Sequence, residues 1–222
     1  MANYRTLVLF LILTFFSYAD GLPKGFVSVK DYIPNIELEL RYYTTNNFIG
    51  KRVDGYNSNR AILSIEATKA LAKVQKDLNQ FGLGLKIFDA YRPQKAVDNF
   101  VRWGKDLNDT LKKDEYYPTV DKKNLFRDGY IAQKSGHSRG STIDLTIIDM
   151  DNKLELDMGS SFDFFGKISW IEYSKITPQQ RANRMLLHTI MIKNGFRAYT
   201  QEWWHFTLEN EPYLSRYFDF DI

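Results

Sequence analysis

The sequence has no cysteine and only three histidines among its 222 residues. The absence of cysteine excludes disulfide bonds, and it also excludes thiolate as a ligand for any bound metal. Stability must therefore come from packing, to which an aromatic content of 15% contributes. If the chain binds a metal, the ligands must be nitrogen and oxygen atoms.

The net charge is also small, and long apolar runs are rare. Lysine and arginine outnumber aspartate and glutamate by only 30 to 27, which is too small an excess to indicate a nucleic-acid partner. The one long apolar run, TLVLFLILTFF, follows a short basic start and has eleven residues. Because that length is too short to span a bilayer as a helix, we expect a secretory signal cleaved after Ala19, with an uncleaved anchor as the alternative.

The remaining 203 residues contain no second membrane-spanning run, no internal repeat and no linker rich in proline or serine. This pattern predicts a signal segment over 1–19 and one domain over 20–222. The signal predicts an exported protein, periplasmic or secreted. The sequence carries no indication of the oligomeric state.

Hydrophobic periodicity predicts several elements in the first half of the chain. The alternating stretch FVSVKDYIPNIELELRYYTT predicts strands interrupted at Pro34. A helix is expected from Ile65, and a strand then ends at Asp89. Pro93 is expected at the first position of the next helix, which leaves Arg92 at a junction between strand and helix. The buried faces expected for these two helices are Leu71, Val74, Leu78 and Phe81 for the first, and Ala96, Phe100 and Leu107 for the second.

The second half predicts fewer regular elements. Residues 105–128 show no clear period and are expected to form a loop, whereas residues 142–147 alternate as a strand does. Thr177-Pro178-Gln179-Gln180 resembles a capping box that opens a helix, and EWWHFTL is typical of a strand. Strands with interspersed helices indicate an α+β fold.

Three residues are candidate ligands of a catalytic zinc site. His137 stands in SGHSRGS, Asp144 follows in a strand, and His205 belongs to EWWHF. Catalytic zinc keeps three protein ligands and leaves a fourth position for water, and imidazole and carboxylate are the donors available here. The competing interpretation places His137 in a surface turn and makes Asp144 a capping residue.

Glu202 and Arg92 are the candidate catalytic residues. Glu202 lies three residues before His205 in an apolar setting, which raises a carboxylate pKa towards that of a useful general base. Residues three apart on a strand face opposite ways, so we expect Glu202 on the turn that enters the strand. Arg92 could stabilise an oxyanion, or it could simply form an ion pair with Asp89. His188, in the middle of a predicted helix, is expected to be structural.

Taken together, the sequence resembles the D-alanyl-D-alanine dipeptidase family of zinc peptidases. The resemblance is carried by five segments across the chain: RYYTTNNFIGKRVDGY, FDAYRPQKAV, SGHSRGSTIDLTI, LDMGSSFDFF and EWWHF. It implies one zinc ion and a central antiparallel sheet with flanking helices, as in hedgehog and D,D-peptidase domains. It also implies zinc ligands at His137, Asp144 and His205, catalytic roles for Glu202 and Arg92, and substrate contacts at Ser135, Asp163 and Tyr42.

The resemblance implies hydrolysis of the dipeptide D-Ala-D-Ala to D-alanine. Two alternatives remain open from the sequence. A D,D- or L,D-carboxypeptidase would use the same chemistry on longer peptidoglycan stem peptides. A secreted metal-bearing binding module would share the scaffold, but it would need neither the base Glu202 nor the oxyanion donor Arg92.

Overall fold

The computed structural model describes residues 21–222. The expected signal segment over 1–19 lies outside the described residues. Within the described part, no helix combines the length and apolar character needed to cross a membrane. The helices are α1 (Val29–Tyr32), α2 (Ile65–Asn79), α3 (Gln94–Lys105), α4 (Lys113–Tyr116) and α5 (Pro178–Lys193), with short 3₁₀ turns η1 (Arg41–Tyr43), η2 (Lys122–Asn124), η3 (Gly136–Arg139) and η4 (Lys167–Ser169).

The centre of the molecule is a five-stranded sheet in the order β2-β4-β5-β7-β6. Its strands are β2 (Glu37–Leu38), β4 (Leu83–Asp89), β5 (Thr142–Asp149), β6 (Phe196–Ala198) and β7 (His205–Leu208). All neighbouring pairs are antiparallel except β2 and β4. A second, two-stranded sheet pairs β1 (Phe26–Ser28) with β3 (Ile62–Ser64). The expected α+β fold with an antiparallel central sheet is confirmed.

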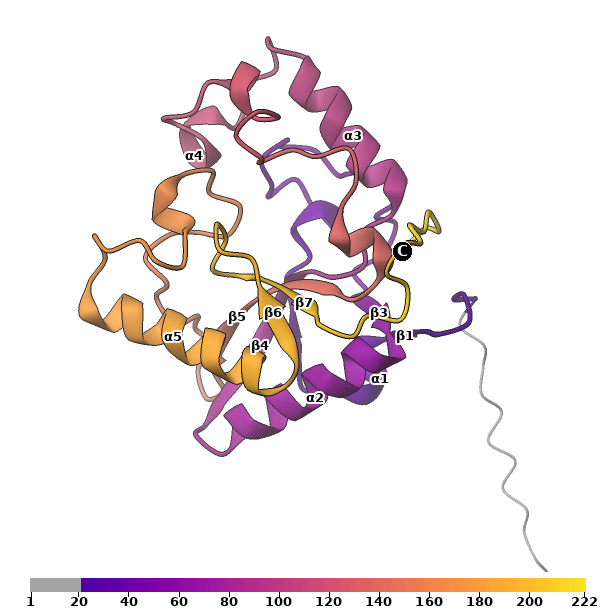
Figure 1. Cartoon of the computed structure of the whole chain (residues 1–222), viewed down its shortest axis with the longest axis vertical. Helices are drawn as coiled ribbons and strands as arrows, with labels where there is room; N and C mark the ends of the chain where they lie inside the picture. The colour runs from indigo at the N-terminus through magenta and orange to yellow at the C-terminus, as the bar shows by residue number, and fades with distance from the viewer. Residues whose placement is uncertain (1–20) are drawn as a thin grey trace, which may run out of the picture.

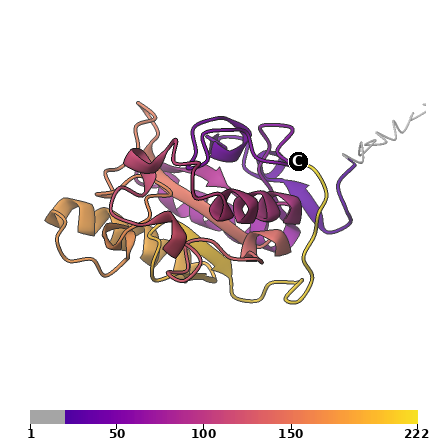
Figure 2. The same ribbon diagram turned by 90° about the horizontal axis from the view of Figure 1, so that it is seen from above.

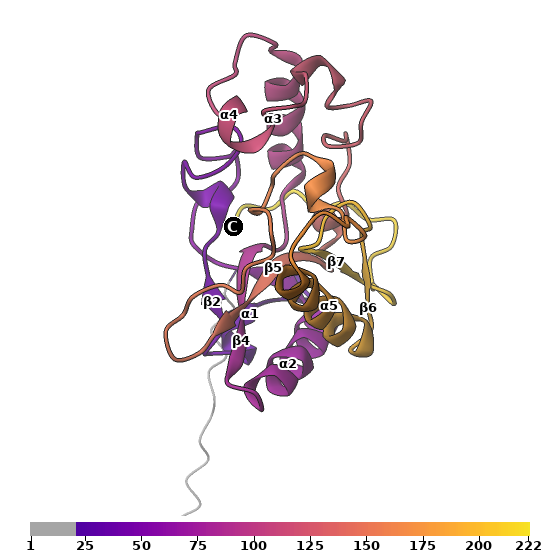
Figure 3. The same ribbon diagram turned by 90° about the vertical axis from the view of Figure 1, so that its left-hand side faces the viewer.

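Helices α2 and α5 pack together along one side of the central sheet, and α3 and α4 lie beyond its other side (Figures 1 and 3). The C-terminal segment runs along the outside of the molecule past β1 and β3 (Figure 2). The ring of Phe218, in this segment, packs edge-on against Phe26 of β1. The two sheets and the C-terminal segment therefore share one hydrophobic core.

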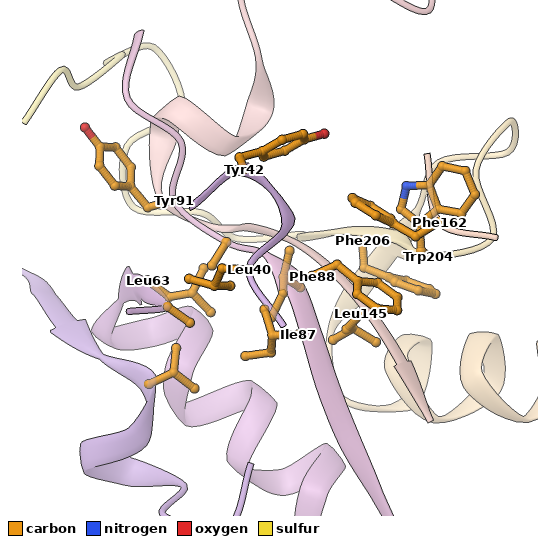
Figure 4. Packing of buried hydrophobic residues seen from close by; sticks show 14 of the residues in the cluster. Leu40, Tyr42, Leu63, Ile87, Phe88, Tyr91, Leu145, Phe162, Trp204 and Phe206 are labelled. Atoms are coloured by element: carbon orange, nitrogen blue, oxygen red, sulfur yellow. The ribbon is translucent and has the colours of Figure 1, made fainter. Parts of the chain in front are cut away.

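The central strand β5 is buried on both faces. Leu145, together with Ile87 of β4, lies on the side of the helices, whereas Tyr42 and Phe162 lie on the opposite side (Figure 4). Asp144 alternates with Leu145 and therefore points to that opposite side. Two layers of aromatic and aliphatic side chains thus enclose a strand that carries a carboxylate.

Three expectations from the sequence need correction. Phe81 is 75% exposed, because α2 ends at Asn79 and the chain turns at Gly82, whose φ is +70°. Leu107 is 53% exposed, because α3 already ends at Lys105. Pro93 is the N-cap of α3 rather than its first helical residue.

Two short helices were also missed. The first strand is followed by α1 instead of further strand, and the region 105–128 contains α4 and η2 within its loop. Both helices have only four residues, which is too short for a helical period to emerge from the sequence. The capping box of α5 is confirmed, since the side chains of Thr177 and Gln180 each bond to the other's backbone N–H.

Candidate metal and catalytic site

His137 is fixed by the tight turn η3, just before β5. Ser135 caps η3 by accepting a hydrogen bond from the His137 backbone N–H at 3.2 Å. The Nδ1 atom of His137 lies 2.7 Å from the carbonyl oxygen of Ala90, which can only accept, so Nδ1 carries the proton. In the neutral ring, the Nε2 atom therefore has a free lone pair, and the ring is almost fully buried.

Asp144 and His205 face each other across the sheet. They are register partners on the antiparallel strands β5 and β7, so their side chains share one face although 61 residues separate them in sequence. The Nδ1 atom of His205 lies 3.0 Å from Asp144 Oδ1 and 3.4 Å from His137 Nε2. Asp144 Oδ2 lies 3.2 Å from His137 Nε2. One ligand atom from each residue lies within 4.8 Å of the other two.

These three residues fit a bound zinc ion. Two imidazole nitrogens and one carboxylate are a donor set that zinc accepts when cysteine is missing. Asp144 Oδ1 is buried and makes no hydrogen bond of acceptable geometry, even though His205 is near. Burial opposes the charge of Asp144, but His137 and His205 hold its pKa well below the usual range. A buried, ionised carboxylate beside two nitrogen ligands is what a divalent cation would stabilise.

Glu202 lies on the turn before β7, as expected from its spacing to His205. The His205 backbone N–H donates to the Glu202 carbonyl at 3.3 Å, which closes that turn. Glu202 Oε2 lies 3.4 Å from His205 Nδ1, so the carboxylate stands beside the three candidate ligands. Burial raises the pKa of Glu202 to about 7, partly offset by His205. A carboxyl group with that pKa can both accept and return a proton near neutral pH.

Arg92 forms the ion pair with Asp89 that the sequence left open, and it also lies beside the candidate metal site. Its Nε donates to Asp89 Oδ2 at 2.9 Å, and its Nη2 lies 3.6 Å from Asp144 Oδ2. The guanidinium also lies over the rings of Tyr42 and Phe100, at 5.0 and 5.1 Å from their centroids. The ion pair with Asp89 therefore orients the guanidinium towards the candidate metal site.

Asp89 was not predicted as a site residue. It is fully buried, and the Tyr56 hydroxyl donates to its Oδ1 at 2.6 Å while Arg92 bonds to Oδ2. The sequence did contain a signal for this role: Asp89 is an acid at the end of an apolar strand, three residues before Arg92. Tyr56 gave no such signal, because it comes from a distant loop.

Asp163, Tyr42 and Ser135 line the same cavity as the metal and catalytic residues, with a volume of about 310 Å³. The Tyr42 hydroxyl donates to Asp163 Oδ2 at 2.7 Å. Burial raises the pKa of Asp163 well above its usual value. The structure thus brings all eight residues expected from the sequence to one cavity, whereas His188 lies apart on α5.

A hydrolytic metal centre inside one α+β domain defines the class of this protein as a metallohydrolase. The profile of the D-ala-D-ala dipeptidase family matches residues 23–222. The chain is 39% identical to the D-alanyl-D-alanine dipeptidase of Enterococcus faecium over 198 residues, covering 89% of this chain and 98% of that protein. The chain therefore belongs to the D-ala-D-ala dipeptidase family of peptidases.

Other relatives give the same result. The D-alanyl-D-alanine dipeptidase of Enterococcus faecalis is 40% identical over 201 residues, covering 90% of this chain and 100% of that protein. The one from Streptomyces coelicolor is 39% identical, with 89% and 98% covered. A solved vancomycin-resistance D,D-pentapeptidase in complex with Zn(II) aligns weakly, with a TM-score of 0.42 and 13% identity over 70% of this chain and 77% of that chain.

Proposed function

We propose that this protein is a zinc dipeptidase that hydrolyses D-Ala-D-Ala to two molecules of D-alanine. The observation that carries the proposal is the convergence of His137, Asp144 and His205 next to Glu202. Membership of the dipeptidase family over nearly the whole described chain supports the substrate. When bound by these three residues, zinc would lower the pKa of a water ligand to roughly 7 and polarise the peptide carbonyl.

Glu202 handles the protons in this proposal. Its carboxylate takes a proton from the attacking water as the C–O bond forms, and it returns that proton to the nitrogen of the leaving D-alanine as the C–N bond breaks. The position beside His205 Nδ1 and the pKa of about 7 suit both transfers. Arg92, held by Asp89, places positive charge where the oxyanion develops.

The pocket also suits a free dipeptide. Asp163 supplies a carboxylate for the substrate ammonium group, and Tyr42 holds that carboxylate in place. The Ser135 hydroxyl accepts from His137 and keeps its own proton for a substrate oxygen. A cavity of about 310 Å³ is small, which favours a dipeptide over a longer stem peptide.

The test is zinc-dependent release of D-alanine from D-Ala-D-Ala, compared with an acylated tripeptide that ends in D-Ala-D-Ala. The proposal expects turnover of the dipeptide and little turnover of the tripeptide. Preferential cleavage of the acylated tripeptide would instead favour the carboxypeptidase alternative. Tight metal binding without turnover of either would favour a binding module.

We further propose that the protein is exported after cleavage following Ala19, leaving one domain over 20–222. The basic start and the apolar run of residues 6–16 support this. Export would bring the enzyme to D-Ala-D-Ala outside the cytoplasm. The mass and N-terminal sequence of the protein from separated cell fractions test the proposal, and an intact Met1 in the cytoplasmic fraction would contradict it.

A further inference from the structure

Arg184 on α5 is a buried cation whose hydrogen bonds go to backbone carbonyls and a hydroxyl rather than to a carboxylate. Its side chain is almost completely buried, and Asp157, the acid within residues 21–222 that acts on it electrostatically, forms no salt bridge with it. Burial lowers its pKa to about 10, so it remains charged at neutral pH. Because an unpaired buried charge is costly, its hydrogen bonds must satisfy it.

Those hydrogen bonds all go to one loop. Arg184 Nε donates to the Met158 carbonyl at 2.6 Å, Nη1 to the Trp170 carbonyl at 2.9 Å, and Nη2 to the Ile168 carbonyl at 2.9 Å. We call residues 158–170 the Asp163 loop. One guanidinium therefore holds both ends of this loop against α5, which a lysine with its single nitrogen could not do in the same geometry.

The Asp163 loop needs such support. Asp163 has a φ of +60°, a conformation that costs free energy for a residue other than glycine and persists only where its surroundings fix it. Within the loop, the Ser169 hydroxyl donates to the Phe164 carbonyl at 2.6 Å. At its tip, Asp163 accepts from Tyr42 and lines the candidate active-site cavity.

The same loop contacts the turn that carries Glu202. Trp203 Nε1 donates to the Ser160 hydroxyl at 2.9 Å, and the Trp203 backbone N–H donates to the Ser169 carbonyl at 3.0 Å. Arg184 Nη2 lies 3.5 Å from the same Ser160 hydroxyl. A shift of the Asp163 loop would therefore move Asp163 most and the general base Glu202 less.

We propose that Arg184 is a positioning residue for substrate binding, because it holds the Asp163 loop so that the Asp163 carboxylate meets the amino group of the dipeptide. The inference rests on the proposed function, since it assigns the ammonium group of the substrate to Asp163. It adds a residue outside the cavity that determines how well the cavity recognises a free amino terminus.

The test combines kinetics with a double-mutant cycle of Arg184→Lys and Asp163→Asn. A small misplacement of a binding group strongly weakens its contact with the substrate. Arg184→Lys should therefore raise KM for D-Ala-D-Ala roughly 10- to 100-fold and lower kcat much less. In the presence of Asp163→Asn, Arg184→Lys should add little further to KM, because both changes disturb the same contact. Zinc content should stay at the wild-type value.

Arg181→Ala is the matched control, because Arg181 lies on the same helix but is exposed and donates to the Ser174 carbonyl, outside the loop. It should leave KM unchanged. Hydrogen exchange gives a readout independent of activity: amides of residues 158–170 should exchange faster in Arg184→Lys than in Arg181→Ala. If Arg184→Lys does not fold, Arg184→Gln takes its place, with the same expectations.

A folded Arg184→Lys variant with wild-type KM and wild-type exchange in the loop would overturn the inference. The inference would also be overturned if Arg184→Lys raised KM by the same factor with and without Asp163→Asn, because Arg184 would then not act through Asp163. A wild-type protein that fails to hydrolyse D-Ala-D-Ala would contradict the proposed function instead. In that case, exchange in the loop would still decide whether Arg184 holds it.

Discussion

At the scale of single residues, the site depends on how each polar atom is already engaged. His137 gives its Nδ1 proton to a backbone carbonyl, and this leaves Nε2 free to bind a metal. Arg92 is held by Asp89, so its charge needs no rearrangement when an oxyanion forms. Glu202 lies next to the three candidate ligands but stays outside their group. Each role leads to a different result when the residue is removed.

Replacing Glu202 with alanine should abolish hydrolysis and leave zinc bound, because the carboxylate is a base and not a ligand. Turnover of D-Ala-D-Ala and metal analysis of the purified variant check both statements. Loss of zinc together with Glu202 would make this residue a fourth ligand.

Replacing Arg92 with alanine should lower kcat by roughly 100- to 1000-fold. This corresponds to the loss of about 2.7–4 kcal/mol of transition-state stabilisation that is usual when one oxyanion donor is removed. Zinc should remain, since a guanidinium has no lone pair for a metal and Arg92 lies 3.6 Å from Asp144 Oδ2. Because the change also leaves Asp89 buried without its cation, thermal unfolding must be measured alongside. A stable variant with wild-type kcat would remove Arg92 from the mechanism.

His205→Ala should release the metal, because it removes one of three ligands. His188→Ala is a matched control, since His188 is a partly buried histidine on α5 away from the cavity. The control should keep zinc and activity. Zinc content after gel filtration distinguishes the two, and full occupancy in His205→Ala would remove His205 from the ligand set.

At the scale of secondary-structure elements, the register between β5 and β7 builds the site. It places Asp144 opposite His205, while the turn before β7 brings Glu202 to the same place. The sequence allowed the turn to be predicted, because the spacing of three residues is incompatible with a regular strand. The pairing of β5 with β7 could not be predicted from alternation alone, because several strands of the chain alternate in the same way.

The N-terminus of α5 offers a test of stability that does not touch the site. Thr177→Ala removes half of the capping box and should lower the free energy of unfolding by ~1 kcal/mol. The urea midpoint should fall while kcat and KM stay at wild-type values. A change in KM would mean that the start of α5 also controls the Asp163 loop.

At the scale of the whole molecule, the sequence predicted the single domain, the fold class and eight of the residues that line the cavity. It failed where a helix ends earlier than its periodicity indicates, and where a contact joins residues far apart in the sequence. Phe81 and Leu107 fit the periodicity of their helices, but each helix ends before it reaches them. Arg184 could not be singled out, because nothing in its neighbourhood along the chain indicates that it binds a loop 14 to 26 residues away.

The central claim is that two histidines and one aspartate, brought together by the fold, bind the zinc ion of a dipeptidase. The most direct measurement is anomalous diffraction at the zinc absorption edge from crystals of the active protein. The account predicts one strong peak within about 2.0–2.2 Å of His137 Nε2, His205 Nδ1 and an Asp144 oxygen. An active enzyme whose zinc peak lies elsewhere, or that shows no peak between these three side chains, would contradict it.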